Sequence, residues 1–256
     1  MAYAALAVGA ALTPLASAQT TTWFYGGTNN SATFGVTADS SQAITWQDSW
    51  AAADTFANSN YFGTESLQVN RPDALGIEQG IAMYGFGGTG LNAADVTSAL
   101  LYLRSDFSFP TGSPNTWNIV GIANGNTSWD TSTMTWNDIN GGAAGDWTGG
   151  TLGASLAGNF GSFQDLGTSN DTNIAIDITS ALQAYLAGSI SGIAFVNSTT
   201  GDTFSANDYA FVPFSNDNTT ATNRPGLLVT TQVIPEPSSV LLGLLGTLAL
   251  VRRRRC

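Results

Sequence analysis

The stretch Ala99-Leu100-Leu101-Tyr102-Leu103 decides the fold class, because it is a short apolar run between polar residues. Runs of this length that are bounded by turn-forming residues are typical of β-strands. Six more such runs occur along the chain, at residues 66–69, 80–84, 117–122, 173–177, 192–196 and 227–229. Their spacing predicts an all-β fold, and a region of roughly 210 residues can form one sandwich domain.

One segment departs from the strand pattern. In residues 179–188, Leu182, Tyr185 and Leu186 fall on one face at helical spacing, and Gly188 supplies a C-terminal stop. We therefore expect a single jelly-roll-like β-sandwich at residues 19–232, with one short helix covering an end of it.

The composition excludes several kinds of chemistry. The 256 residues include no His and no Lys, and the single Cys is Cys256, the last residue. Without His there is no imidazole base, no Ser-His-Asp triad and no commonest zinc ligand. Without Lys there is neither a P-loop nor a Schiff base. The folded part also lacks a disulfide and a thiol nucleophile.

The charge balance restricts the partners. Residues 19–232 carry only Arg71, Arg104 and Arg224 against 17 acidic residues. Such a surface repels nucleic acid and anionic polysaccharide, because almost nothing on it can replace their counterions. We expect no nucleic-acid partner.

The N-terminal 18 residues have the pattern of a signal peptide. An apolar stretch ends in Ala16-Ser17-Ala18, the small-x-small pattern that a signal peptidase cleaves, so Gln19 would be the new N-terminus. No basic residue precedes the apolar stretch, which is unusual for a signal. The alternative interpretation is a buried first helix, which the missing caps and the polar residues that follow make the weaker of the two.

The C-terminal segment 233–256 has three parts. The triplet Pro235-Glu236-Pro237 ends any preceding strand, residues 240–251 are apolar and uncharged, and Arg252, Arg253, Arg254 and Arg255 follow. Twelve helical residues reach about 18 Å, short of the roughly 30 Å hydrocarbon core of a bilayer. The four Arg place the end of the chain on the cytoplasmic side and the domain outside. We expect contact with the membrane to be transient and through this tail only.

This tail closely resembles the PEP-CTERM sorting signal of Gram-negative bacteria. The Pro-Glu-Pro triplet, the short hydrophobic helix and the Arg-rich end stand in the order of that family. The resemblance implies recognition and removal by an exosortase-type processing enzyme. It covers residues 233–256 only.

A second resemblance spans roughly residues 47–231. Its most distinctive part is Ser128-Trp129 followed by Thr133-Met134-Thr135-Trp136-Asn137. Its last block is a strand that begins with Arg224-Pro225-Gly226-Leu227. These blocks resemble the DNRLRE-type β-sandwich family, which is related to carbohydrate-binding modules. The sequence departs from that family at Ala82 and Gly85, where a basic residue and an Asp are frequent, and the name-giving stretch is absent. The resemblance implies the fold more directly than a ligand.

Exposed indoles are the first candidates for contact with a glycan, since sugar rings stack on aromatic faces beside polar groups. Trp147, in the glycine-rich stretch 141–150, is the best candidate. Trp129, Trp136 and the neighbouring Asn137 are further candidates, although for the two indoles we favour a place in the core.

Acidic residues suggest two other sites. Asp202, Asp208 and Asp217 lie in polar stretches before the last strand and can supply the oxygen ligands of a structural calcium ion, although ordinary turn chemistry explains them as well. A pair of carboxylates can hydrolyse a glycoside, but the sequence places no such pair. We assign no catalytic residue and expect a protein that is not an enzyme, with no cofactor beyond this calcium.

These observations predict an exported protein of the outer surface or extracellular matrix of a Gram-negative-type bacterium. We expect a non-catalytic module that associates with neutral glycan or exopolysaccharide. The alternatives are a purely structural or adhesive surface protein without a discrete ligand and, more weakly, a polysaccharide hydrolase or lyase.

Overall fold

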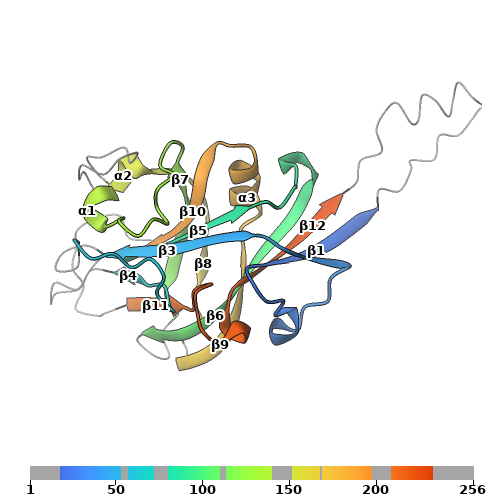
Figure 1. Ribbon diagram of the computed structural model, residues 1–256, viewed down its shortest axis with the longest axis horizontal. Coiled ribbons are helices and arrows are strands. Elements are labelled where there is room, and N and C mark those ends of the chain that lie inside the picture. Colours follow the sequence, from blue (N-terminus) through green and yellow to red (C-terminus); the bar gives the residue numbers. More distant parts are fainter. Residues whose placement is uncertain are drawn as a thin grey trace, which may run out of the picture. The chain divides into compact units, whose positions relative to one another are not determined.

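The computed structural model describes residues 18–52, 57–71, 80–109, 114–139, 152–167, 169–197 and 209–232. Their body, Thr20–Thr231, is an all-β sandwich (Figure 1). The strands are β1 (Gln19–Tyr25), β2 (Ser40–Ala43), β3 (Thr45–Ala52), β4 (Val69–Arg71), β5 (Gly80–Gly87), β6 (Val96–Phe109), β7 (Thr116–Ala123), β8 (Leu156–Gln164), β9 (Ser169–Asp177), β10 (Ile190–Asn197), β11 (Tyr209–Pro213) and β12 (Gly226–Gln232). The helices are α1 (Trp136–Ile139), α2 (Leu152–Ser155) and α3 (Thr179–Leu186).

Strand pairing builds two layers. One layer has the order β3-β5-β10-β7-β8, and its strands pair antiparallel. In the other layer β6 pairs with β9 and with β12, and β1 and β2 follow beyond β12. Strands β11 and β4 link β6 to β5 and so connect the layers.

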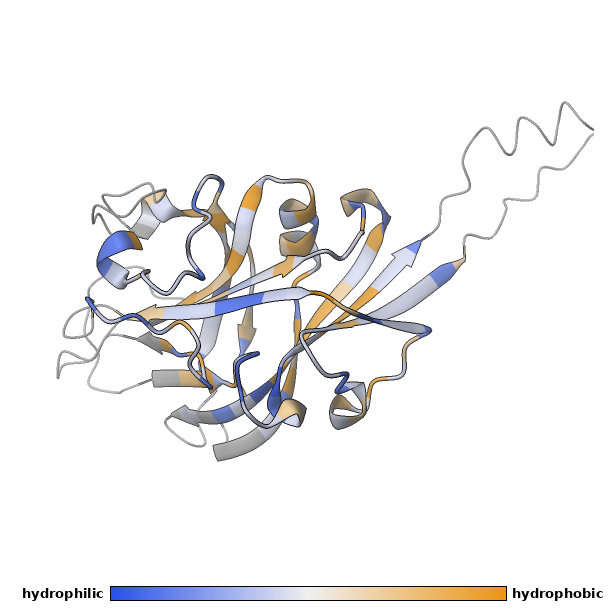
Figure 2. Cartoon of the chain, in the orientation of Figure 1, coloured by the Kyte–Doolittle hydropathy of each residue, from blue (hydrophilic) through white to orange (hydrophobic). Residues whose placement is uncertain are grey.

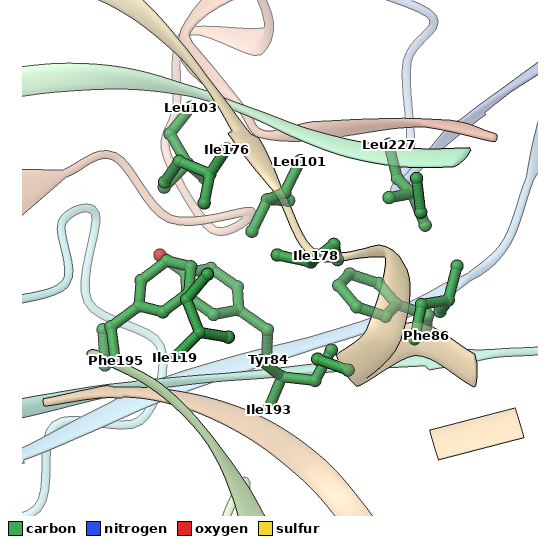
Figure 3. Close-up of a cluster of buried hydrophobic side chains, with 14 of the residues drawn as sticks. Tyr84, Phe86, Leu101, Leu103, Ile119, Ile176, Ile178, Ile193, Phe195 and Leu227 are labelled. Carbon is green, nitrogen blue, oxygen red and sulfur yellow. The ribbon is translucent and has the colours of Figure 1, made fainter. Parts of the chain in front are cut away.

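The main core lies between these layers. Alternate residues of β5, β7 and β10 face alternate residues of β6, β9 and β12, as the two-residue period of a strand requires. Figure 3 shows Leu101, Leu103 and Ile176 on one side of this core and Ile119, Tyr84 and Phe195 on the other. Ile178, just before α3, lies between the two sides.

A second core covers the outer face of the β5, β10 and β7 layer. The segment from Asn126 to Ile139 folds over this face and buries Trp129, Met134 and Trp136 against Ile81, Met83 and Val120, among others. Gly85 and Gly192 make room for Trp129, since a Cβ on Gly85 would lie 2.8 Å from its Cζ2 atom and a Cβ on Gly192 3.1 Å from it. A side chain such as Asp at position 85 is therefore incompatible with this packing.

A third aromatic cluster lies on the outer face of the other layer. Trp23 is fully buried against Phe34 and Tyr102, at ring-centroid distances of 5.7 and 5.5 Å. A Cβ on Gly226 would lie only 2.0 Å from Cζ2 of Trp23, so the indole occupies the space that a side chain at position 226 would need.

The predicted elements largely match the structure. All seven apolar runs lie in or against strands, although β4 begins at Val69, and Ser66 forms only an isolated bridge to Phe214. The predicted helix is α3, which ends before Gly188 at φ +71°. Strands β1, β2, β3 and β8 were not predicted, because their apolar residues are interrupted by Thr, Ser, Gln, Asp or Gly. Strand β11 was missed although its sequence, Tyr-Ala-Phe-Val-Pro, is uninterrupted.

We expect the substitution Gly226→Ala to destabilise the fold by about 1–3 kcal/mol or more, because the new methyl group overlaps the Trp23 indole and overpacks the cluster. Gly87→Ala is the matched control, since its Cβ would meet Thr45 at 3.3 Å, where a small shift accommodates it. Urea unfolding of the two variants measures the difference. Equal stability of both would contradict the assigned packing of Trp23.

Candidate functional site

Two of the three tryptophans predicted to contact a glycan lie within the described residues. Trp129 and Trp136 are 1% and 5% exposed, so both belong to the core and neither offers an indole face to a sugar. The glycan-contact interpretation is therefore wrong for these two, and the reason is that they cover the outer face of the β5, β10 and β7 layer. Trp147 lies outside the described residues.

The remaining predicted ligands are only partly described. Asn137 is exposed, and its side-chain N–H donates to Oδ1 of Asn58 at 2.7 Å. Asp217 is exposed as well, whereas Asp202 and Asp208 lie outside the described residues. Within the described part of the chain, no three His, Cys, Asp or Glu residues come together as a metal-binding group.

The residues predicted for export and sorting lie at the ends of the fold. Ala18 precedes β1 and Gln19 is its first residue, while Ala16, Pro235, Glu236, Pro237 and Arg252 to Arg255 lie outside the described residues. The helices found in the described ranges are all too short or too polar to span a bilayer.

The most unusual polar group in the described structure is Asp48. It lies in the middle of β3, whose hydrophilic stretch is visible in Figure 2, and its side chain faces the main core between Trp46 and Trp50. Asp48 is only 6% exposed. The Nε1–H of Trp46 donates to its Oδ2 at 3.0 Å, and the backbone N–H of Asn216 donates to the same oxygen at 2.8 Å.

Asp48 ties the segment 214–218 to the sandwich. The Asn216 bond joins this segment to β3, while the N–H of Ser215 donates to the Glu65 carbonyl at 2.9 Å. Gly26 packs directly on Asn216, because a Cβ at position 26 would lie 2.2 Å from Oδ1 of Asn216. The carboxyl group therefore anchors segment 214–218 to β3, and the two segments are distant in sequence.

Burial dominates the electrostatics of this anchor. Desolvation raises the pKa of Asp48 to about 7, the N–H of Asn216 and Nε1–H of Trp46 oppose that rise, and the charge of Asp217 adds to it. Desolvation, followed by the charge of Asp48, also raises the pKa of Tyr84, its cross-strand partner. A carboxyl that titrates near neutrality can act as an acid or base. The Asp48 carboxyl is enclosed by core side chains, so the expected effect of its titration is a change in the stability of the fold.

A surface hollow lies at the opposite edge of the same layer. We call it the seam hollow, and it has a volume of about 230 Å³ and is lined by Ile119, Phe160, Gly161, Ser162, Asp177, Thr179 and Ser180. These residues come from β7, β8, the end of β9 and the first turn of α3. Among the described strands, β8 is the edge of one layer and β9 pairs only with β6 in the other, so the hollow opens at the seam between the two layers.

Irregular backbone in β8 shapes this hollow. The pairing of β8 with β7 shifts register twice, and Gly158 and Gly161 have φ values of +71° and +121°. Bulges of this kind are common at sheet edges, where they redirect side chains. The Phe160 ring lies against Gly158, since a Cβ there would be 3.2 Å from Cζ of Phe160. Ser162 is exposed beside it.

Asp177 is fixed at the rim of the seam hollow by the start of α3. Its Oδ1 accepts the Thr179 N–H at 2.9 Å and the Thr179 hydroxyl at 2.6 Å, which holds the carboxylate against the first residue of α3. The sequence places Asp177 at the end of the apolar run 173–177, two residues before the predicted helix begins. Neither Asp177 nor Phe160 was predicted as a site residue, because the seam exists only after β8 and β9 separate into different layers.

Comparison with known proteins adds no assignment: no family model matches the chain, and no curated protein is significantly similar to it.

The raised pKa of Asp48 predicts how stability changes with pH. In the unfolded chain this group has a pKa of 3.8, so between about pH 4 and pH 7 the folded protein keeps a proton that the unfolded chain releases. The free energy of unfolding therefore falls as the pH rises from about 4 to 7, and it levels off above 7. Each tenfold change in proton affinity is worth about 1.36 kcal/mol, which gives a loss of about 4 kcal/mol.

The variant Asp48→Asn should abolish this loss, because an amide keeps an acceptor for Trp46 and Asn216 but does not titrate. Chemical unfolding of both proteins from pH 4 to pH 8 measures the effect. Asp39→Asn is the control: hydrogen bonds from Thr21 lower the pKa of exposed Asp39, so its contribution is lost toward acid pH instead. Parallel curves for wild type and Asp48→Asn would refute the prediction.

Proposed function

We propose that this protein is exported and processed at both ends, and that its sandwich serves at the outer surface or in the extracellular matrix of a Gram-negative-type bacterium. In this proposal the signal peptide is residues 1–18, the module is residues 19–232, and residues 233–256 form a PEP-CTERM-type tail that an exosortase-type enzyme removes. The sandwich is a non-catalytic module that associates with neutral glycan or exopolysaccharide.

The observation that carries the processing part is the position of the first and last strands. β1 begins at Gln19, β12 ends at Gln232, and the two strands are neighbours in one layer (Figure 1). The hydroxyls of Thr20 and Thr231 lie 3.0 Å apart. The two ends of the described body therefore lie side by side, and cutting before Gln19 and after Gln232 removes no residue of either buried cluster.

The finer description of the module belongs to the same proposal. A jelly-roll-like arrangement of the DNRLRE type is supported by the order of the sequence blocks and by a sandwich with one short helix after Asp177. The Ser128-Trp129 and Trp136-Asn137 blocks serve this module as a cover of its outer face, which explains their distinctive spacing.

Two features support a neutral glycan as the ligand: the excess of acidic residues in the domain and the side chains that line the seam hollow. Three Arg against 17 acids in residues 19–232 disfavour acidic polymers. The seam hollow supplies a half-buried aromatic ring beside hydroxyl and carboxylate groups, which is a suitable lining for a sugar. Trp147 remains the candidate contact outside the described residues.

The non-catalytic assignment is supported by the position of Asp48. The one described carboxyl whose pKa is raised to about 7 is enclosed and hydrogen-bonded by Trp46 and Asn216, out of reach of a polymer. The second candidate function is a structural or adhesive surface protein, which the anchoring hydrogen bonds and the dense aromatic packing also fit.

The processing proposal predicts the ends of the mature protein. Mass spectrometry of protein recovered from the surface of its native host should find Gln19 as the first residue and nothing beyond Pro237. Variants with Pro235 and Pro237 both changed to Ala should keep the tail and stay with the membrane fraction. Recovery of surface protein that still ends in Arg252 to Cys256 would exclude the exosortase step.

The glycan proposal predicts binding that is selective for neutral polymers and only weakly dependent on salt. Tryptophan fluorescence of the full-length protein, titrated with neutral and acidic polysaccharides, should give dissociation constants between about 1 mM and 1 µM for a neutral polymer. Trp147→Ala tests the contact predicted from sequence, and an unchanged affinity would remove that residue. Tight binding of alginate or pectate would contradict the charge argument, whereas no response to any polymer would favour the structural alternative.

A further inference from the structure

The seam hollow has two surfaces of different chemistry. Its floor is formed by Ile119, which is 2% exposed, and by Phe160, which is half-buried and packs against the main core. Its rim is formed by Ser162, Asp177 and Ser180, which are all exposed. The lining is mostly polar, with the exposed part of the Phe160 ring as its main apolar surface. This combination matches a sugar ring, whose faces carry C–H groups and whose edge carries hydroxyls.

The rim groups are held in place before any ligand arrives. Oδ1 of Asp177 is occupied by the two hydrogen bonds from Thr179, so the carboxylate orientation is fixed by the first turn of α3. Phe160 is confined by Gly158 behind it, and Asn159 fixes the next turn by accepting the Gly161 N–H at 2.9 Å. Preorganised groups of this kind lower the entropy lost when a weak ligand binds.

The size and charge of the hollow restrict its occupant. A volume of about 230 Å³ is below the roughly 300–1,000 Å³ of a site for a drug-sized ligand, so it holds about one sugar ring and not a length of chain. No Lys or Arg lines it, and Asp177 would repel a uronate or a sulfated sugar. A hydroxyl of a neutral sugar, in contrast, can donate to the carboxylate.

We propose that the seam hollow between β8 and the start of α3 binds one neutral hexose ring of a glycan, with the ring face on Phe160 and its hydroxyls on Asp177, Ser162 and Ser180. This inference rests on the proposed glycan association and adds its location and the unit it recognises. The rest of the polymer runs along strand β8, where Asn159, Ser162 and Gln164 are exposed.

The test uses isothermal titration calorimetry of the full-length protein with neutral trisaccharides of glucose, galactose and mannose. Phe160→Leu keeps an apolar side chain against the core but removes the ring face, so it should weaken binding at least 10-fold. Ser162→Ala removes one rim hydroxyl and should weaken binding about 3- to 10-fold, the worth of a hydrogen bond of about 1 kcal/mol. Near-UV circular dichroism establishes that both variants are folded.

Phe62→Leu is the matched control. Phe62 is 46% exposed and belongs to a different surface, the turn after Asn60, so this variant should bind as the wild type does. A glucuronate trisaccharide tests the charge argument, and preference for it over the neutral sugars would overturn the proposal.

The outcomes separate this inference from the function on which it rests. If the protein binds a neutral saccharide but Phe160→Leu and Ser162→Ala bind it equally well, the seam hollow is not the site and the glycan function stands. If neither a neutral trisaccharide nor a neutral polysaccharide binds to the wild type, both are wrong. Loss of binding in Phe62→Leu alone would also overturn the assignment to the hollow.

Discussion

Burial of large indoles against glycines is the packing constraint on which the described structure depends. Trp23 occupies the space above Gly226, Trp129 occupies the space above Gly85 and Gly192, and a Cβ on Gly26 would lie 2.7 Å from Cβ of Trp46. The indoles of Trp23 and Trp129 each cover a strand at a point where a side chain is missing, whereas Gly26, just after β1, makes room for the Cβ of Trp46. Since protein interiors are close-packed, neither member of such a pair can change alone without a void or an overlap.

Buried indoles also explain where the internal polar groups lie. A Trp N–H that leaves water needs an acceptor, and the interior supplies one in three cases: Asp48 for Trp46, Thr64 for Trp50 and Asp165 for Trp117. Asp48 and Asp165 also accept backbone N–H groups, from Asn216 and Asn115 respectively. The acidic groups of the core thus hold loops to strands, and the raised pKa of Asp48 is the electrostatic consequence of that role.

The seam hollow, in contrast to Asp48, lies outside the close-packed core, at the edge where the two layers separate. The two layers are linked by β11 and β4, whereas β8 and β9 form edges of different layers. The register shifts and positive-φ glycines of β8 keep this edge irregular, which protects it from pairing with another strand. The same irregularity places Phe160 and Ser162 beside Asp177. The bulges that protect strand β8 from further pairing therefore also shape the seam hollow.

The sequence by itself determined the fold class, the seven apolar strands, helix α3 and the limits set by charge and composition, because these follow from local periodicity and residue chemistry. It indicated a core place for Trp129 and Trp136 but could not identify the surface that they cover. Strands such as β3 and β8 escaped detection, because Asp48 and the glycines 158 and 161 break the alternation for reasons found only in distant partners. The tertiary structure alone decided that Asp48 anchors Asn216 and that Phe160 and Asp177 share a hollow. Both arrangements join residues from different segments and layers, and no local pattern encodes which segments become neighbours.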